Sequence, residues 1–539
     1  YFHWSPDGKY ILLGMADFGS DLAGMQGAIS VGLDKRDVDR NPDWAPVVEG
    51  GPQAAPWRSL WLYDIDEGTV RKLSPEGMNV WLAGWCGSDR IVASCSNQPE
   101  ETYWYSADLR IIDIDNGDVR NLFKPKDQIG CLVAAPSGRI IALVEAVCSD
   151  RNIVAGNIRL IDVQSCVVSS VPSVDADVVQ LNWRDDNRLL FVGASGPETI
   201  VGLLDQRDGS VQNLWRDNER VPFGGVFPEV TPLGSDAENI LFLLESYFEA
   251  PKLTVLKHGR EHVIRHFGTP ETSATTSRLG AARSITWSAP DGASIQGWFL
   301  APSNPGPHPV IMNVHGGPVW YYRPTYIGRS ALMQMALGAG YALFFPNPRG
   351  SSGRGQDFAR LVFGDMGGND TYDYLSGLDA LESKGLIDPK RIGVTGGSYG
   401  GYISSLLITQ DQRFAASVPA SPVTNWVSQH LTCNVPTFCQ TFLDDQLSNP
   451  MGKYFTRSPI HHAHRVKTPT LHICGALDKI TPPGQALEFH RVLQENGVES
   501  VLVTYPGEGH GVRNMPTTFD YVSRTMAWFI KHMPPSAKK

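Results

Sequence analysis

The first half of the chain repeats a short pattern, in which a strand-like run ends near an aspartate and leads into a polar turn. Asp64, Asp113 and Asp162 occupy this position at two successive intervals of 49 residues. A second signal, a polar turn just before a strand-like run, recurs at residues 5–8, 135–138 and 185–187. A period of about 40 to 50 residues with about four short strands per unit is typical of a β-propeller. Each blade buries its faces only by stacking on its neighbours, so the repeat predicts a ring-like all-β domain.

Five blades can be distinguished within a predicted propeller domain of residues 1–275. Their expected limits are residues 1–75, 76–124, 125–173, 174–218 and 219–268. The alternative, a β-sandwich, fits the sustained period less well. The first blade contains a long insertion rich in Gly, Asp and Pro, from Ala16 to Trp57, which is long enough to be a functional loop or arm.

From residue 276 to residue 539 the pattern changes to strands that alternate with helices. Strands are expected at residues 309–314, 342–346, 391–395, 415–419, 470–474 and 500–505, and helices at 329–337, 370–384, 483–496 and 519–532. Such alternation predicts a mostly parallel sheet with helices on both faces, the architecture of an α/β-hydrolase. The predicted fold class is therefore an N-terminal all-β propeller followed by a C-terminal α/β-hydrolase domain.

Residues 396–401, Gly-Gly-Ser-Tyr-Gly-Gly, lie between a predicted strand and a predicted helix. A serine between glycines at such a junction is typical of a nucleophile elbow, a turn so sharp that side chains at Gly396 and Gly400 would collide with backbone. The turn raises the hydroxyl of Ser398 above the sheet edge. We therefore expect Ser398 to be the nucleophile.

The partners of this serine are expected at the ends of later strands, in the chain order Ser, Asp, His. Asp478 follows the strand 470–474, and His510 follows the strand 500–505. His510 would accept the proton of Ser398 and later donate it to the leaving group, while Asp478 would orient the imidazole. A capping carboxylate and a surface histidine are the alternatives, and the order and placement argue jointly against them.

An acyl-transfer site also needs hydrogen-bond donors for the oxyanion. The backbone N–H of Tyr399 directly follows the nucleophile, and His315-Gly316-Gly317-Pro318 follows the strand 309–314 in the manner of an oxyanion loop. We assign the two donors to the N–H groups of Tyr399 and Gly317, although an ordinary Gly-Gly-Pro turn is the alternative for the second.

Composition excludes several other classes of function. The net charge of −10 argues against nucleic acid or an anionic membrane as a partner, and no apolar run is long enough to span a bilayer. No Cys/His spacing suits a metal, and residues 461–464, His-His-Ala-His, are interpreted as a solvated turn, so no metal or cofactor is expected. The eight cysteines are interpreted as isolated thiols and lean towards a reducing, cytoplasmic compartment, although the sequence does not decide the localisation. A homo-oligomer is compatible with the sequence.

The hydrolase half resembles the prolyl oligopeptidase family of serine peptidases, and in particular its acylaminoacyl-peptidase and aminopeptidase-like branch. The matching segments are residues 315–318, 347–358, 364–370, 396–401 and 505–510. The resemblance implies a propeller that caps the active site and restricts substrates by size. It also implies Ser398, Asp478 and His510 as the triad, with Tyr399 and Gly317 as oxyanion donors.

The chain departs from the family pattern in three respects. Propellers of the family commonly have seven blades, so five blades and a first residue Tyr1 suggest an atypical ring or missing N-terminal residues. Many members carry a polar residue two positions after the catalytic Asp, where this chain has Ile480. No convincing acidic pair for gripping a free N-terminus is found, since Glu100-Glu101 is interpreted as a solvated turn.

Further residues are candidates for the walls of the substrate pocket because they are aromatic or follow predicted strand ends. They are His315, Trp320, Tyr321, Tyr322, Trp426 and Ile480. For the aromatic residues, a plain core position is an equal alternative.

The leading hypothesis is a serine hydrolase that cleaves amide bonds of short or N-terminally modified peptides through an acyl-enzyme intermediate. One rival is the same chemistry on a non-peptide ester or small amide, which Ile480, the aromatic segment and the long insertion favour. The other is a non-enzymatic propeller with a degenerate hydrolase, against which the complete triad argues.

Overall fold

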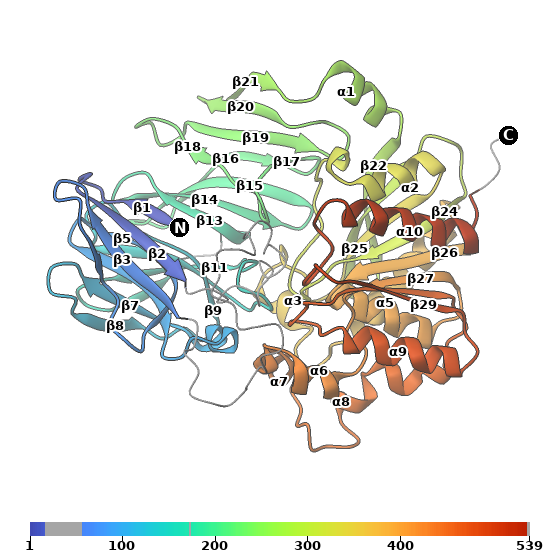
Figure 1. Cartoon of the computed structure of the whole chain (residues 1–539). Helices are drawn as coiled ribbons and strands as arrows, with labels where there is room; N and C mark the ends of the chain where they lie inside the picture. Colours follow the sequence, from blue (N-terminus) through green and yellow to red (C-terminus); the bar gives the residue numbers. More distant parts are fainter. Residues whose placement is uncertain (17–56, 172–173, 536–539) are drawn as a thin grey trace.

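The computed structural model describes residues 1–16, 57–171 and 174–535. An all-β half (blue to green) and an α/β half (yellow to red) lie side by side (Figure 1). The insertion predicted from Ala16 to Trp57 falls almost wholly outside the described residues.

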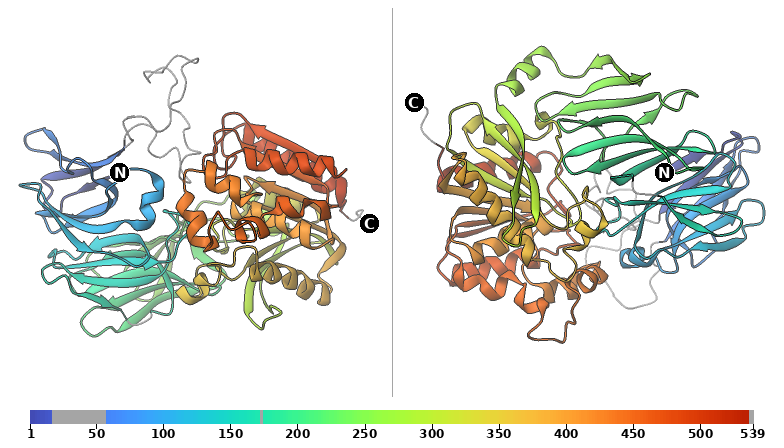
Figure 2. Two further views of the ribbon diagram at one scale, coloured as in Figure 1. Left: turned by 90° about the horizontal axis from the view of Figure 1, so that it is seen from below. Right: turned by 180° about the vertical axis from the view of Figure 1, so that it is seen from behind.

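Within the described residues, five antiparallel sheets follow one another along the all-β half, and Figure 2 shows them fanned out beside the α/β half. Their strands are β1 (Phe2–Trp4), β2 (Tyr10–Ala16), β3 (Arg58–Asp64) and β4 (Val70–Lys72); β5 (Asn79–Cys86), β6 (Arg90–Ser96), β7 (Asp108–Asp113) and β8 (Val119–Phe123); β9 (Gln128–Ala134), β10 (Ile140–Ala146), β11 (Asn157–Asp162) and β12 (Val168–Ser170); β13 (Asp177–Trp183), β14 (Arg188–Ser195), β15 (Glu198–Asp205) and β16 (Val211–Asp217); and β17 (Arg220–Pro222), β18 (Thr231–Pro232), β19 (Ile240–Ser246), β20 (Lys252–Lys257) and β21 (Arg260–His266). Each sheet lies within one of the five predicted blade segments.

The repeated aspartates hold the turns between the last two strands of the first three sheets. Asp113 Oδ1 accepts hydrogen bonds from the backbone N–H groups of Asp115 (3.0 Å) and Asn116 (3.2 Å), and Asp64 and Asp162 accept equivalent pairs. Four residues after each aspartate the backbone adopts a positive φ, which favours glycine. The first two sheets have Gly68 and Gly117 there, whereas the third has Cys166 at φ 58°. The 49-residue repeat therefore reflects one type of turn, held by the same aspartate hydrogen bonds, in three successive sheets.

The α/β half is built on one eight-stranded sheet with the order β22-β23-β25-β24-β26-β27-β28-β29, parallel from β25 onwards. Its strands are β22 (Gly280–Ser288), β23 (Ser294–Pro302), β24 (His308–Val314), β25 (Ala342–Asn347), β26 (Ile387–Gly397), β27 (Phe414–Ala420), β28 (Thr470–Gly475) and β29 (Ser500–Tyr505). Its helices are α2 (Ala331–Ala339), α3 (Gln356–Arg360), α4 (Asn369–Ser383), α5 (Tyr399–Gln410), α6 (Trp426–Thr432), α7 (Pro436–Leu443), α8 (Lys453–Thr456), α9 (Gly484–Glu495) and α10 (Thr517–His532), with 3-10 turns η2 (Ile327–Arg329) and η3 (Pro459–Arg465). The expected fold class is confirmed.

Alternating strand residues send apolar side chains to the two faces of this sheet. On β24, Met312 belongs to a core cluster with α4, α5 and α9, whereas its neighbour Ile311 belongs to a cluster with α2 and α10. The four predicted helices are present, each within two residues of its expected ends. Helices α6, α7 and α8, which lie together between β27 and β28, were not predicted.

The boundary predicted between residues 275 and 276 stays a prediction, and it falls within α1 (Pro270–Ser277), which connects β21 to β22. Contacts between the two halves include Asp177 of β13, whose carboxylate accepts from the N–H groups of Gly353 (2.6 Å) and Gly355 (3.1 Å). None of the described helices is both long and apolar enough to cross a membrane.

Candidate active site

Ser398 lies at the strained junction between β26 and α5, with φ 59° and ψ −121°. A Cβ atom at Gly400 would stand 2.1 Å from the carbonyl oxygen of Val314, and one at Gly396 would stand 2.5 Å from the same atom. Only glycine fits at these two positions, which lets α5 start immediately beneath the end of β24. The result is a tight elbow that leaves Ser398 at the carboxyl edge of the sheet.

His510 and Asp478 lie at the same edge, in the loops that follow β29 and β28. The imidazole Nδ1 stands 2.8 Å from Asp478 Oδ2, in the geometry of a hydrogen bond. The carboxylate also accepts from the N–H groups of Ile480 and Thr481, both at 2.9 Å, and from the Thr481 hydroxyl at 2.9 Å. Asp478 is therefore held by four donors, which fixes its orientation towards the imidazole.

The charges of the site shift the pKa values of this pair in opposite directions. Burial lowers the pKa of His510, but the carboxylates of Asp478 and Asp150 outweigh it, so the pKa lies above its ordinary value. Burial raises the pKa of Asp478, but His510 and the hydrogen bonds from Thr481 outweigh it, so the pKa lies below its ordinary value. The pair thus favours a carboxylate beside an imidazole that binds a proton readily.

The loop that follows β24 lies directly against the elbow. A Cβ atom at Gly316 would stand 3.4 Å from Ser398 Cβ, and Gly317 adopts φ 113°. The side chain of His315 lies beneath this loop rather than in a pocket, with Nδ1 at 2.8 Å from the Gly316 carbonyl oxygen and Nε2 at 3.0 Å from Ser351 Oγ. Burial lowers the pKa of His315 to about 4, so the ring is neutral and donates from Nδ1 to the carbonyl. His315 therefore supports the loop, and its expected place in the pocket wall is wrong.

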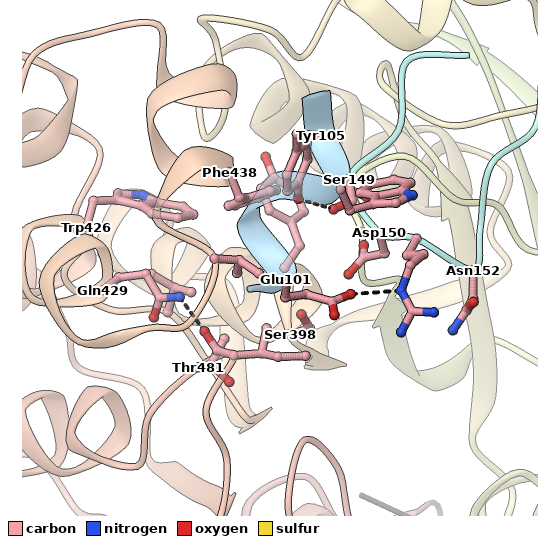
Figure 3. A pocket seen from close by; sticks show the side chains of 17 residues that line it. Glu101, Tyr105, Ser149, Asp150, Asn152, Ser398, Trp426, Gln429, Phe438 and Thr481 are labelled. Atoms are coloured by element: carbon pink, nitrogen blue, oxygen red, sulfur yellow. Dashed lines mark hydrogen bonds and ion pairs between the residues drawn. The ribbon is translucent and has the colours of Figure 1, made fainter. Parts of the chain in front are cut away.

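Two cavities meet at Ser398. The first is a narrow slot of about 50 Å³, with the apolar wall residues Val423, Trp426, Val435, Phe438 and Ile480 from the α/β half and Tyr105 from the all-β half (Figure 3). Trp426 and Ile480 were predicted as wall residues, whereas Phe438 belongs to α7, which was not predicted. An apolar slot beside a nucleophile suits an apolar side chain.

Glu101 and Arg151, which line the rim of the first cavity, come from the all-β half. Glu101 pairs with Arg58 at 3.1 Å and with Arg151 at 2.9 Å, and the three side chains are only 7 to 11% exposed. The interpretation of Glu100-Glu101 as a solvated turn is therefore wrong for Glu101, because the 3-10 turn η1 (Glu101–Ser106) carries it into the interface between the halves.

Comparisons with known proteins identify the family of this chain. The model of the prolyl oligopeptidase family matches residues 329–535. The acylamino-acid-releasing enzyme of Arabidopsis thaliana is 30% identical over 574 residues, which cover 93% of this chain and 74% of that protein. The chain belongs to the prolyl oligopeptidase family. The resemblance seen in the sequence is thereby confirmed.

Further proteins match this member of the prolyl oligopeptidase family over different lengths. The uncharacterized peptidase YuxL of Bacillus subtilis is 36% identical over 263 residues, which cover 46% of this chain and 39% of that protein. The first rice acylamino-acid-releasing enzyme is matched over only 33% of its length. The solved acylaminoacyl peptidase of Pyrococcus horikoshii superposes with a TM-score of 0.77 at 22% identity and covers 99% of this chain and 81% of that one, which shows a shared fold.

The second cavity, of about 550 Å³, is also lined by Ser398 in this member of the family. Its lining includes His510, Gly317 and the predicted residues Trp320, Tyr321 and Tyr322, together with Phe223–Val226 of the all-β half. The described residues include no hydrogen bond between Ser398 and His510, a bond that is often long in free enzymes.

Asp150, which the sequence did not single out, lines both cavities. It follows Ser149, whose hydroxyl accepts from Val319 N at 3.4 Å and whose carbonyl accepts from the Tyr105 hydroxyl at 2.5 Å. The loop between β10 and β11 therefore touches the loop that carries Gly317. No local motif marks these residues, and only the docking of the two halves brings them to the site. Among the described residues, no group of three or more His, Cys, Asp or Glu side chains is placed to hold a metal ion.

Proposed function

We propose that the protein is a serine hydrolase that cleaves amide bonds of short or N-terminally modified peptides. His510 Nε2 accepts the proton of Ser398 as its hydroxyl oxygen attacks the carbonyl carbon, and Asp478 stabilises the imidazolium that results. The N–H groups of Tyr399 and Gly317 donate to the oxyanion. His510 then protonates the leaving amine, and water hydrolyses the acyl-enzyme through the same residues.

The observation that carries this proposal is the pairing of His510 with Asp478 beside a serine on a strained elbow. The Arabidopsis relative is named for the release of acylated amino acids. Support for selection by size comes from the walls of both cavities, to which the two halves of the chain contribute.

A fluorophosphonate probe and a substrate panel test the proposal together. The probe is expected to label the wild type at Ser398 and to leave Ser398→Ala unlabelled. The panel contains aminoacyl, acyl-aminoacyl and simple ester chromogenic substrates, and we expect turnover of the amides. Turnover of esters alone would favour the alternative, a hydrolase of non-peptide esters or small amides. The apolar side chain of Ile480, which lines the first cavity, supports this alternative. Absence of both labelling and turnover would refute a hydrolase of any kind.

A further inference from the structure

The second cavity contains a buried arginine whose charge is not matched. Arg323 is only 7% exposed and lines this cavity. In the part of the chain that the structure describes, its guanidinium has no hydrogen bond or ion pair, and its Nε is buried without any partner. The interaction that it does make is with the ring of Tyr321, whose centroid lies 5.9 Å from Cζ. Buried charges are ordinarily paired, so an arginine in this state is a candidate for binding a ligand.

Two neighbours of Arg323 offer further donors without partners. Among the described residues, neither the Tyr321 hydroxyl nor Trp320 Nε1 has a hydrogen-bond partner, although both atoms are buried and both residues line the same cavity. Indole N–H and guanidinium N–H groups only donate, and a phenol donates readily. Three residues with buried, unsatisfied donor atoms therefore line this cavity, which suits an acceptor group and above all an anion.

Glu245 is the acidic side chain whose charge acts on Arg323, but its carboxylate is already engaged by other donors. Glu245 accepts from both terminal nitrogens of Arg329 and from the N–H of Tyr326 at 3.1 Å. Burial lowers the pKa of Arg323, and Tyr321 and Glu245 oppose this effect only from a distance. Arg329 takes up this carboxylate, so the positive charge of Arg323 has no ion pair among the described residues. Asp150, like Ser398, lines both cavities.

The position of His510 indicates which part of a substrate enters the second cavity. His510 lines the second cavity but not the first. Because the imidazole hands its proton to the leaving group, the leaving group lies on the side of His510. The acyl part of the substrate then occupies the first cavity, the apolar slot.

We propose that the second cavity holds the leaving fragment of the substrate and that Arg323 and Tyr321 bind a carboxylate on that fragment. This inference rests on the proposed function and names its substrate class: short peptides whose leaving fragment ends in a free carboxylate. An acidic side chain on the fragment offers the same chemistry at another position.

Matched pairs of substrates test the inference in the whole chain, with both halves present. N-acetyl-Leu-Ala with a free C-terminal carboxylate is compared with its C-terminal amide by kcat/KM, and N-acetyl-Leu p-nitroanilide serves as a substrate without a carboxylate. The pair N-acetyl-Leu-Glu amide and N-acetyl-Leu-Gln amide tests whether a side-chain carboxylate is recognised instead. Hydrogen bonds to a charged group predict a preference of about 10-fold to 100-fold for the acid.

Arg323→Met is expected to reduce this preference to about 2-fold, measured as the ratio of kcat/KM for acid and amide within the variant. Tyr321→Phe removes only a hydroxyl without a partner, so it should fold normally and reduce the preference by about 3-fold to 10-fold. Arg260→Met, an exposed arginine on β21, is the matched control and should retain the full preference. If Arg323→Met does not fold, Tyr321→Phe carries the test.

Equal kcat/KM values for acid and amide in both pairs in the wild type would overturn the inference, as would a full preference in both variants. A preference for Glu over Gln without a preference for the free C-terminus would move the carboxylate to the side chain and overturn the substrate class. Failure of the wild type to hydrolyse even the p-nitroanilide would instead refute the proposed function.

Discussion

At the scale of single residues, carboxylates govern the electrostatics of the proposed nucleophile and base. The two that surround His510, Asp478 and Asp150, come from different halves of the chain, and Arg513 opposes them. Each carboxylate stabilises the imidazolium, whereas the proposed mechanism needs the neutral imidazole as the base. Activity should therefore depend on pH through a group whose pKa is raised.

We expect kcat/KM to rise with pH through an inflection above about 6.5, the ordinary pKa of histidine. Asp150→Asn removes a negative charge that favours the protonated ring, so the inflection should move to lower pH by about 0.5 to 1 unit. The measurement is the pH dependence of kcat/KM for a neutral p-nitroanilide in both proteins. A profile that is flat between pH 5 and 8 would contradict the role of His510, and an unchanged inflection in the variant would contradict that of Asp150.

Glu101 is expected to matter for stability as well as for the shape of the first cavity. Glu101→Gln leaves Arg58 and Arg151 without the shared carboxylate in a nearly buried place, which should lower the free energy of unfolding by about 2 kcal/mol or more. The neighbouring Glu100→Gln is the control, because Glu100 is exposed. Urea denaturation of the three proteins gives the comparison, and equal midpoints would show that the two arginines are satisfied by other groups.

At the scale of elements, the elbow shows why local sequence patterns predicted so much of the site. The crossing of β24, β26 and α5 demands glycine at two positions of a six-residue motif, so the sequence records the geometry directly. Asp113 and its equivalents likewise mark the position of a turn in the sequence. Helices α6, α7 and α8 were not predicted because they are short and are stabilised mainly by tertiary packing. One such contact joins the rings of Trp426 and Phe438 beside the first cavity.

Two glycines of the elbow provide a matched pair of substitutions. Gly400→Ala should lower the free energy of unfolding by about 2 kcal/mol or more and reduce kcat at least about 100-fold, because its Cβ would stand 2.1 Å from the Val314 carbonyl oxygen. At Gly397, a Cβ atom would find no atom within 4 Å apart from those of its two chain neighbours. Gly397→Ala should therefore unfold at the same temperature as the wild type. Equal melting temperatures for all three proteins would show that the elbow can relax.

At the scale of the whole molecule, the two halves are joined by buried polar contacts across their interface. Asp177 accepts from two backbone N–H groups of the α/β half and from Gln356 Nε2 at 3.0 Å. These contacts join residues more than 170 positions apart, which no local pattern reveals. The same long range explains why Asp150, Arg151 and Arg323 were not recognised as site residues from the sequence, although each half was predicted correctly in its class.

Loss of Asp177 is expected to loosen this interface without unfolding either half. Asp177→Ala should speed the hydrogen exchange of the Gly353 and Gly355 amides by about 10-fold or more, because both lose their acceptor. Asp66→Ala, at an exposed turn, is the control. Mass-spectrometric exchange of the peptide that spans residues 351–356 measures the effect. Unchanged exchange in the variant would mean that this segment is held by the α/β half alone.

The loop between β10 and β11 gives the protein a way to change what it cleaves without changing how it cleaves. Its residues Ser149 to Asn152 line the first cavity, yet the proposed nucleophile, base and acid all belong to the other half of the chain. Substitutions or altered length in this loop can reshape the walls beside Ser398 while the reacting groups keep their positions. Part of the selectivity is thus inherited on a stretch of sequence separate from the reacting groups, and relatives that share the hydrolase half need not share a substrate.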